Sequence, residues 1–529
     1  MTAPPIVWTV AGTDSGGGAG IAADQRAADA CGVHLCTLVT AVTAQNSRGV
    51  QRIDLLPTAT LEAQFAALQD DMPPAAIKTG LLGGPQQVAC VAHWVDRLRA
   101  RAPVALVVDP VLSASTGAAF ADDATLAACR ALLLPRASLV TPNRREAARL
   151  AGLPDDTPSP TLAAALRARG AASVCVTGGD EPATDGLALD WVASPQADGW
   201  LALPRIDTPH HHGTGCTFAT AAASALARGF VAADALVLAK MATASALRHG
   251  AAAGHGAGPV RARAGFVSDA SLMPQMSWCA APRFAPFIAP GFAATPPPAL
   301  GLYAIVDRAE RVAQVVEAGV RTVQLRIKSP SRPAAGWMNP LRDEIAAATA
   351  CCRAAGAMLF VNDHHALAVA AGAPGVHLGQ EDIALLDDAG RAALVAPGAP
   401  ALGVSAHSLW ELARARSLAP RYIACGPVWP TLTKRMPWRP QGLHNLAWWT
   451  AMAGAPVVAI GGILTADRAR QAAGTGADGI CVVRGLGERP AQTVPGLQAA
   501  LAQARAEAHR KAPDGRDRPD WPDWPTPSL

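Results

Sequence analysis

The chain has 529 residues, a net charge of only +4 at pH 7 and a hydrophobic fraction of 50%. This length exceeds one ordinary domain, so we expect two or three domains with sizeable cores. The scattered basic residues argue against a nucleic-acid partner, and the Ala-rich runs are too short and too interrupted to span a membrane. The 11 cysteines include no C-x-x-C pair. Together with the absence of a signal-peptide pattern after Met1, they predict free thiols and a cytoplasmic protein.

The first half alternates apolar runs with Ala-rich helical stretches. Residues 6–10 predict a buried strand, and the glycine-rich turn at 11–20 leads into a helix from about Ile21, with Asp24 on its first turns. The run 35–44 predicts a strand that ends in Gln45 and Asn46. Further strands are predicted over 76–80, 105–111, 138–143 and 173–179. This pattern predicts an α/β fold with a mostly parallel sheet and ligands at the strand ends.

A second glycine-rich turn, residues 212–216, precedes the helical run 217–228. Its glycines, Gly213 and Gly215, free the first N–H groups of the helix to face an anion, and the helix dipole adds to the attraction. The turn is therefore a candidate anion hole for a transferring γ-phosphoryl group, where a thiolate at Cys216 would be favoured. The alternative is a plain turn with a buried cysteine. The three consecutive histidines at 210–212 cannot easily converge on one ion, so no metal is expected there.

Seven motifs carry a family resemblance. They occupy residues 11–24, 40–49, 78–81, 108–111, 141–147, 212–216 and 254–259. In this order, residues 5–263 resemble the hydroxymethylpyrimidine/phosphomethylpyrimidine kinases of thiamine biosynthesis, which have a ribokinase-like fold. The resemblance implies two successive ATP-dependent phosphorylations. It also implies that Gln45 hydrogen-bonds the aminopyrimidine, that Asp24 lies near the same substrate, and that Gly213, Gly215 and Cys216 form the anion hole.

Two departures leave alternatives open for this half. Many family members have Lys where Ser115 and Thr177 stand, so phosphate-side charge would have to come from elsewhere, for instance from Lys78 and Mg²⁺. These departures keep open a decayed, pyrimidine-binding regulatory domain. A pyridoxine-type kinase of the same fold is the other alternative, against which Gln45 and Cys216 argue.

The second half predicts a (β/α)₈ barrel over 300–505. Residues 264–299 mix Met, Trp, Phe and Pro without a period, which predicts a linker partly packed on a domain. Residues 506–529 are charged and Pro-rich, which predicts a disordered tail. Between them lie eight short apolar runs separated in several places by Ala-rich helical stretches, as a barrel requires. The runs are 302–307, 322–328, 358–363, 375–379, 402–407, 422–427, 457–462 and 479–483.

Polar residues follow these runs, where barrels bind their ligands. The second run alternates, placing Gln324, Arg326 and Lys328 on one face with two cations within roughly 7 Å. Such a face suits pyrophosphate, although a solvated edge strand is the alternative. Asp363 and Asp382 are hard oxygen ligands suited to one Mg²⁺, the alternative being helix capping and loop salt bridges.

The motifs at 323–328, 362–363, 376–382, 426–434 and 459–463 resemble thiamine phosphate synthase over about 302–502. This resemblance implies that hydroxymethylpyrimidine pyrophosphate is joined to a thiazole phosphate carboxylate, with release of pyrophosphate and CO₂. The implied pyrimidine pyrophosphate residues are Gln324, Arg326, Lys328, Asn362, Ser405 and Lys434. The implied Mg²⁺ ligands are Asp363 and Asp382. The implied thiazole phosphate residues are Thr431, Thr433, Gly462, Val483 and Arg484.

Two positions depart from the synthase pattern. Ile327 replaces a usual Glu on the apolar face, where we expect little effect. Arg484 replaces a usual small hydroxyl residue and either grips the thiazole phosphate or points outward. Together the two resemblances predict a bifunctional thiamine-biosynthesis enzyme that uses Mg²⁺ and ATP and acts on small molecules. Homodimer formation, channelling and feedback control stay open.

Overall fold

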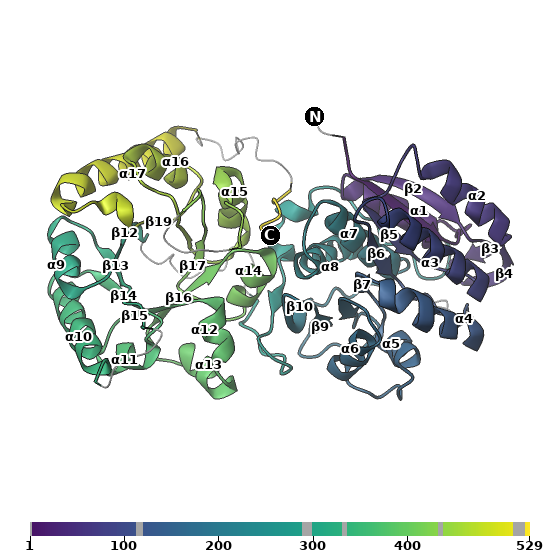
Figure 1. The fold of residues 1–529 in the computed structure, drawn as a ribbon, viewed down its shortest axis with the longest axis horizontal. Coiled ribbons are helices and arrows are strands. Elements are labelled where there is room, and N and C mark those ends of the chain that lie inside the picture. The colour runs from purple at the N-terminus through teal and green to yellow at the C-terminus, as the bar shows by residue number, and fades with distance from the viewer. Residues whose placement is uncertain (1–2, 113–119, 288–298, 331–335, 432–436, 512–523) are drawn as a thin grey trace. The chain divides into compact units, whose positions relative to one another are not determined.

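The computed structural model describes residues 3–112, 120–287, 299–330, 336–431, 437–511 and 524–529. The chain divides into two compact units, Met1–Phe284 and Ala285–Leu529, which Figure 1 shows in purple to teal and in green to yellow. The boundary falls inside the predicted linker. Most of the described part of that linker belongs to the first unit, since its strand β11 (Gln275–Met276) pairs with that unit's sheet.

The first unit is built on a nine-stranded sheet in the order β11-β10-β9-β8-β7-β6-β5-β1-β2. The strands from β2 to β8 run parallel and the remainder antiparallel. The mostly parallel sheet predicted from the sequence is therefore confirmed. The strands are β1 (Ile6–Ala11), β2 (His34–Val39), β5 (Ala76–Thr79), β6 (Ala105–Val108), β7 (Leu139–Val140), β8 (Val174–Val176), β9 (Leu187–Ala193) and β10 (Asp198–Pro204).

The helices of this unit alternate with the strands, as the Ala-rich stretches predicted (Figure 1). Because the sheet is parallel and covered, β1 is buried along nearly its whole length. The helices are α1 (Gly20–Ala30), α2 (Thr58–Leu68), α3 (Pro85–Arg99), α4 (Asp123–Ala128), α5 (Arg144–Ala151), α6 (Ser159–Ala168), α7 (Thr214–Ala227) and α8 (Ala232–Arg248).

The strand predicted over 35–44 is two strands. The chain leaves the main sheet at the buried Thr40, whose N–H donates to Ala11 O at 3.0 Å. It then forms β3 (Ala41–Asn46), which pairs with β4 (Gly49–Leu55) as a separate antiparallel hairpin. Gln45 and Asn46 still end a strand, but that strand belongs to the hairpin.

The second unit is a closed barrel of eight parallel strands, β12 to β19 in sequence order (Figure 1). All eight predicted runs are strands, each ending one to three residues before the predicted end. They are β12 (Gly301–Val306), β13 (Thr322–Leu325), β14 (Met358–Asn362), β15 (Gly375–Leu378), β16 (Ala401–Ala406), β17 (Tyr422–Cys425), β18 (Val457–Ala459) and β19 (Gly479–Val482).

Helices follow the barrel strands on the outside. They are α9 (Ala309–Glu317), α10 (Met338–Ala354), α11 (His365–Ala370), α12 (Gln380–Leu385), α13 (Asp388–Leu394), α14 (Leu409–Arg416), α15 (Gly442–Met452), α16 (Ala466–Ala473) and α17 (Pro490–Lys511). Inside the barrel, Tyr303, Phe360 and Tyr422 pack together, with the rings of Phe360 and Tyr422 5.0 Å apart.

The predicted disordered tail is wrong for its two described parts. α17 continues to Lys511, and residues 524–529 lie against α15. Asn445 Oδ1 accepts from the N–H of Thr526 at 3.2 Å, and Asn445 Nδ2 donates to Thr526 O at 3.5 Å. Ser528 O accepts from the N–H of Arg439 at 2.8 Å. These reciprocal bonds satisfy the backbone of a Pro-rich segment whose composition gives no helix or strand signal.

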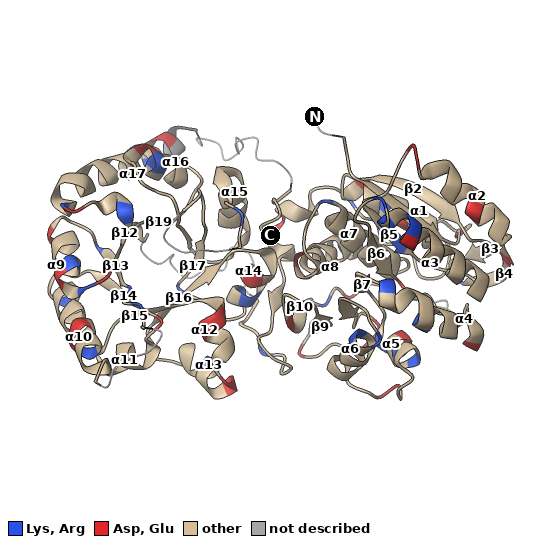
Figure 2. Ribbon diagram, in the orientation of Figure 1, with Lys and Arg blue, Asp and Glu red and all other residues tan. Residues whose placement is uncertain are grey.

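Charged residues are distributed over both units (Figure 2). All 11 cysteines are free thiols, as predicted. Among the described residues, no helix is both long and apolar enough to cross a bilayer.

Candidate active sites

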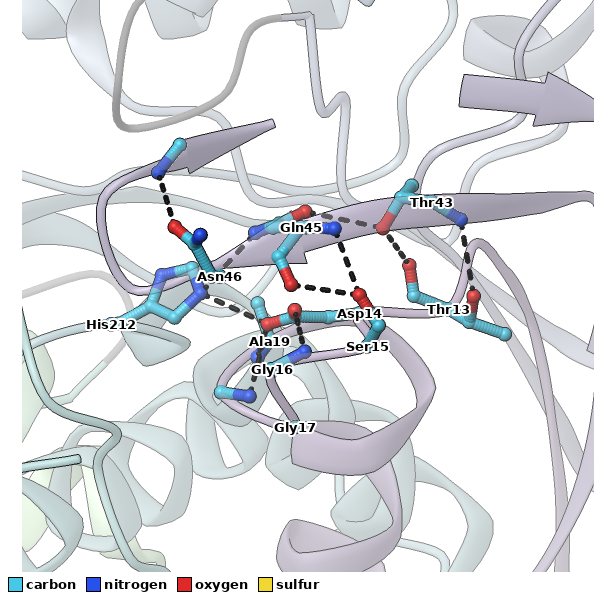
Figure 3. A network of polar contacts seen from close by, with 12 residues as sticks. Thr13, Asp14, Ser15, Gly16, Gly17, Ala19, Thr43, Gln45, Asn46 and His212 are labelled. Atoms are coloured by element: carbon cyan, nitrogen blue, oxygen red, sulfur yellow. Dashed lines mark hydrogen bonds and ion pairs between the residues drawn. The ribbon is translucent and has the colours of Figure 1, made fainter. Parts of the chain in front are cut away.

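The glycine-rich turn after β1 folds around one carboxylate. Asp14 accepts hydrogen bonds from the N–H groups of Gly16 at 2.8 Å, Gly18 at 2.9 Å and Ala19 at 2.8 Å (Figure 3). Burial opposes ionisation of Asp14, but hydrogen bonds from His212 and from these backbone groups lower its pKa overall. The turn is therefore held by a carboxylate that is charged at neutral pH.

His212 joins this turn to Gln45. Its Nε2 lies 3.1 Å from Asp14 Oδ2 and 3.4 Å from Gln45 Nε2 (Figure 3). An ionised carboxylate only accepts hydrogen bonds, so Nε2 of His212 carries a proton directed at Asp14. The Gln45 nitrogen is also a donor and cannot bond the same protonated nitrogen. The two groups are therefore neighbours without a hydrogen bond between them, and the Gln45 amide keeps its donor capacity.

The predicted anion hole adjoins the first glycine-rich turn. α7 follows Gly213, whose φ of +89° is left-handed. A Cβ at position 213 would lie 2.3 Å from the carbonyl oxygen of Gly18, so only glycine lets the two turns touch. Gly215 is exposed, with open space where a Cβ would stand. The first turn of α7 is thus open at Gly215.

Cys216 occupies the first turn of α7 and is half-buried. Desolvation raises the pKa of its thiol to about 12, although the Lys78 ammonium and the N–H of Gly20 act in the opposite direction. The expectation of a favoured thiolate is therefore wrong, because burial outweighs the helix N-terminus. Any part that Cys216 plays starts from the protonated thiol.

Asp24 and Lys78 form a fully buried ion pair. Lys78 Nζ donates to the two carboxylate oxygens at 2.9 and 3.0 Å, and the hydroxyls of Thr9 and Thr220 donate to the same carboxylate. Both charged side chains have no exposed area. The Asp24 carboxylate is therefore out of a substrate's reach, whereas its partner extends toward Asp109, whose Oδ2 lies 3.7 Å away.

Asp109 lines a pocket at the ends of β5 and β6, together with Thr79, Gly80 and Phe120. Burial raises the pKa of Asp109 to about 6, against the pull of Lys78. Burial and then the Asp109 charge raise the pKa of Glu146 to about 8. The sequence motifs contained both residues, but only the tertiary contact brings their carboxyls together.

The sequence lacks the usual lysines at positions 115 and 177. Ser115 lies outside the described residues. Thr177 follows β8 and is half-buried, and its N–H donates to Pro142 O at 2.8 Å. Close to Thr177 along the chain, Glu181 forms an ion pair with Arg144 at 3.0 Å. Asp190, which pairs with Lys240 at 2.8 Å, accepts from the N–H of Gly178 at 2.9 Å.

In the second unit, Gln324 is the one member of the predicted basic face that lies on β13. It is 3% exposed and donates from Nε2 to the Tyr303 hydroxyl at 3.2 Å. Since β13 ends at Leu325, the prediction that Arg326 and Lys328 lie on the strand is wrong. They follow it, at the end of the barrel where parallel strands present their carboxyl termini. Arg326 is half-buried and Lys328 exposed.

Asp363 and Asp382 come from consecutive strand ends. Desolvation and then repulsion from Asp382 raise the pKa of Asp363, whereas Arg326 lowers it. Asp363 has a φ of +66°, and its N–H donates to His377 O at 3.1 Å. Asp382 also caps α12, since its Oδ2 accepts from the N–H of Gly379 at 2.9 Å.

This carboxylate pair fits a magnesium ion. Mg²⁺ takes one or two protein carboxylates and completes its shell with phosphate oxygens and water. Two carboxylates close enough to repel one another provide that donor set beside a guanidinium. The described residues hold no cluster of three or more His, Cys, Asp or Glu side chains, so substrate oxygens would have to complete the shell.

A buried hydrogen-bonded chain crosses the barrel interior and was missed from the sequence. It runs from Gln324 through Tyr303, Tyr422 and His377 to Ser405. Burial raises the pKa of both tyrosines far above the usual range, so both are neutral phenols. The only available signal was that these are the only two tyrosines of the chain. Asn362, at 5% exposure, ends the adjacent β14.

The predicted thiazole phosphate residues lie in loops at the same end of the barrel. Gly462 has a φ of +72°, and a Cβ there would meet the Trp429 side chain at 2.5 Å. Val483 follows β19, and Arg484 begins a short 3₁₀ turn with an exposed side chain. Thr431 is described and half-buried. Thr433 and Lys434 lie outside the described residues.

Comparisons with known proteins fit the two halves separately. The family model described as phosphomethylpyrimidine kinase matches residues 14–261, and the one described as thiamine monophosphate synthase matches residues 302–486. A hydroxymethylpyrimidine/phosphomethylpyrimidine kinase from Streptomyces coelicolor is 42% identical over 259 residues, covering 49% of this chain and 94% of that protein. A pyridoxal kinase structure from Bacillus subtilis is 28% identical, covering 49% of this chain and 98% of that chain, with a TM-score of 0.45.

The fold and the family models define a two-domain enzyme class in which a phosphomethylpyrimidine kinase precedes a thiamine monophosphate synthase with a closed eight-stranded barrel. A probable thiamine biosynthetic bifunctional enzyme, chloroplastic, from Oryza sativa is 34% identical over 507 residues, covering 92% of this chain and 86% of that protein. A chloroplastic thiamine biosynthetic bifunctional enzyme from Arabidopsis thaliana is 34% identical over 478 residues, covering 87% of this chain and 85% of that protein. The chain belongs to this family of bifunctional thiamine biosynthetic enzymes, with hydroxymethylpyrimidine/phosphomethylpyrimidine kinase and thiamine phosphate synthase activities. The pyridoxine-type and regulatory alternatives are not better supported.

Proposed function

We propose how the two activities are distributed over the residues described above. In the first unit, the Gln45 amide binds the aminopyrimidine, and the N-terminus of α7 binds the transferring phosphoryl group of ATP. Support for this arrangement comes from His212, which contacts Gln45 and immediately precedes Gly213. Phosphoryl transfer depends mainly on positioning and charge stabilisation, which a rigid pair of turns supplies.

Lys78 is the cation that we propose stabilises charge beside the kinase pocket, and it acts through its electrostatic field because its side chain, like that of Asp24, has no exposed area. It is held by Asp24 and directed at Asp109, beside the pocket. Asp24 then acts by positioning Lys78 rather than by touching the pyrimidine. This gives the kinase a fixed cation despite Thr177. Asp109, which lines the pocket, is the carboxyl that we propose faces an ATP-bound Mg²⁺. Both carboxylate oxygens of Glu146 already accept backbone N–H groups, from Asn143 at 3.0 Å and from Leu112 at 3.4 Å.

In the barrel, the observation that carries the proposal is the Asp363–Asp382 pair beside Arg326. We propose that the pair binds Mg²⁺, which when bound neutralises pyrophosphate oxygens. Arg326, Lys328, Ser405 and Lys434 are proposed to hold the same anion. The leaving pyrophosphate is thereby stabilised as the pyrimidine C–O bond ionises, and the thiazole nitrogen captures the resulting cation. The remaining proposed roles belong to Gln324 and Asn362 for the pyrimidine and to Thr431, Thr433, Gly462, Val483 and Arg484 for the thiazole phosphate.

One assay tests both units together. The purified chain is incubated with hydroxymethylpyrimidine, ATP, Mg²⁺ and thiazole phosphate carboxylate, and thiamine phosphate, ADP and pyrophosphate are quantified. We expect two ADP per thiamine phosphate. ADP without thiamine phosphate would refute the synthase assignment, and thiamine phosphate only from added pyrimidine pyrophosphate would refute the kinase assignment. The cytoplasmic location and a homodimer stay predictions, which fractionation and light scattering would check.

A further inference from the structure

Two proposed site residues, Gln324 and Ser405, are joined through three side chains in the barrel core. Gln324 Nε2 lies 3.2 Å from the Tyr303 hydroxyl, which is 2.7 Å from that of Tyr422. Tyr422 is 2.8 Å from Nδ1 of His377, and Nε2 of His377 is 2.9 Å from Ser405 Oγ. The imidazole also stacks on the Tyr422 ring, at 5.6 Å and 15°. The four links are therefore hydrogen bonds of 2.7–3.2 Å within a packed core.

The protons available to these five side chains determine which group donates in each hydrogen bond. Gln324 donates to the Tyr303 oxygen, so the Tyr303 proton is directed at Tyr422. The Tyr422 proton must then go to Nδ1 of His377, which places the imidazole proton on Nε2. Nε2 donates to Ser405, and the Ser405 proton is left to point elsewhere.

The opposite direction is costly. Ser405 would donate to Nε2, His377 to Tyr422, and Tyr422 to Tyr303. Tyr303 would then receive two donors, and neither hydrogen-bonding neighbour could accept its own proton. Tyr303 is 1% exposed, so its donor would be left unsatisfied in the barrel core, away from water. The forward direction therefore predominates.

We propose that His377, held by two buried tyrosines, is a positioning residue that fixes the Ser405 hydroxyl as a hydrogen-bond donor toward the departing pyrophosphate. The inference rests on the proposed role of Ser405 in the synthase reaction. An anion can only accept, so a serine that spent its proton on the histidine would present a lone pair to negative charge. Because the donor is oriented before substrate binds, no reorganisation is needed as charge develops.

Two substitutions at one position separate positioning from packing. In His377→Gln the amide can take the place of Nε2 and still donate to Ser405. In His377→Asn the amide takes the place of Nδ1 and keeps only the tyrosine contact. We expect the Asn variant to lose about tenfold or more in synthase kcat, the size of one hydrogen bond to a charged group. The Gln variant should stay within about threefold of the parent. Equal losses in the two variants would overturn the proposal.

A double-mutant cycle with Ser405→Ala tests whether His377 acts through Ser405. We expect His377→Asn to have no further effect on kcat once Ser405 is alanine. Additive losses would overturn the inference while leaving the Ser405 assignment intact. Full synthase activity in Ser405→Ala alone would instead remove Ser405 from the proposed site. The kinase rate of the same polypeptide should stay unchanged throughout, which controls for concentration and folding.

The imidazole tautomer can be measured directly. In the full-length protein labelled with ¹⁵N-histidine, the His377 resonances, assigned by their loss in His377→Gln, should show a protonated Nε2 and an unprotonated Nδ1. Tyr422→Phe keeps the ring and deletes only the hydroxyl, so it should fold, lower kcat and release the tautomer preference. A protonated Nδ1 in the parent protein would overturn the proposed direction.

Discussion

Replacing Lys78 by methionine should destabilise the kinase unit and abolish its activity. The ammonium has no exposed area and lies 2.9 and 3.0 Å from the two oxygens of Asp24 and 3.7 Å from Asp109. Its removal leaves a buried carboxylate whose remaining donors are two threonine hydroxyls. Breaking such a pair costs about 3–5 kcal/mol. For a unit of this size we expect Tm to fall by roughly 6 °C or more.

The loss should depend on pH in a defined direction. Burial already raises the pKa of Asp109 to about 6 in the parent protein. Without the ammonium, which lowers it in the parent protein, the folded-state pKa of Asp109 rises further above its unfolded value. The folded variant then binds more protons than the unfolded chain, so its stability falls as pH rises through the folded-state pKa. The difference in Tm from the parent should therefore be larger at pH 8 than at pH 5.

Differential scanning calorimetry at the two pH values measures the difference in Tm. The kinase and synthase activities that remain after stepwise heating assign each thermal transition to its unit. Arg101→Met, which breaks an exposed ion pair with Asp70 in the same unit, is the matched control. Adding Asp24→Leu to Lys78→Met should recover part of the loss, since apolar pairs can replace buried ion pairs at little cost. A fall of less than about 2 °C with kinase activity retained would refute the proposed role of the pair.

Three further predictions address other parts of the chain. Asp363→Asn keeps the side-chain shape and tolerates the positive φ of this position. We expect the synthase kcat to fall about 100-fold, to be partly restored by excess Mg²⁺, and the kinase rate to stay unchanged. A parallel fall of both rates in folded protein would contradict two separate sites. Cys216→Ala should lower only the kinase rate, about tenfold, and a full rate would exclude the thiol from catalysis. Asn445→Leu removes two hydrogen bonds to Thr526. The free energy of unfolding of the barrel, measured in urea, should therefore fall by about 1–3 kcal/mol. An unchanged urea midpoint would show that residues 524–529 contribute nothing to stability.

Much of the fold could be predicted because its signals are local. A strand covered on both faces is a continuous apolar run, and both sheets are largely of this kind. Eight such runs predicted the eight barrel strands in order. The strand predicted over 35–44 was wrong because Thr40, which redirects the chain, is held by Ala11, a residue distant in sequence. The antiparallel strands β9 and β10 were not predicted, although Ser194-Pro195 between them is a turn signal.

The sequence by itself determined the residue types at the strand ends, and these determine the chemistry: amide and glycine turns in one unit, carboxylates and cations in the other. Tertiary structure alone decided which of them can meet a ligand. It buried Asp24 beneath Lys78, kept the Cys216 thiol protonated, and ended β13 before Arg326. It also linked Ser405, through His377 and Tyr422, to Tyr303, which is far away in the sequence. The physical reason is that burial and hydrogen-bond direction depend on neighbours brought together by folding, whereas strand periodicity depends only on the adjacent residues.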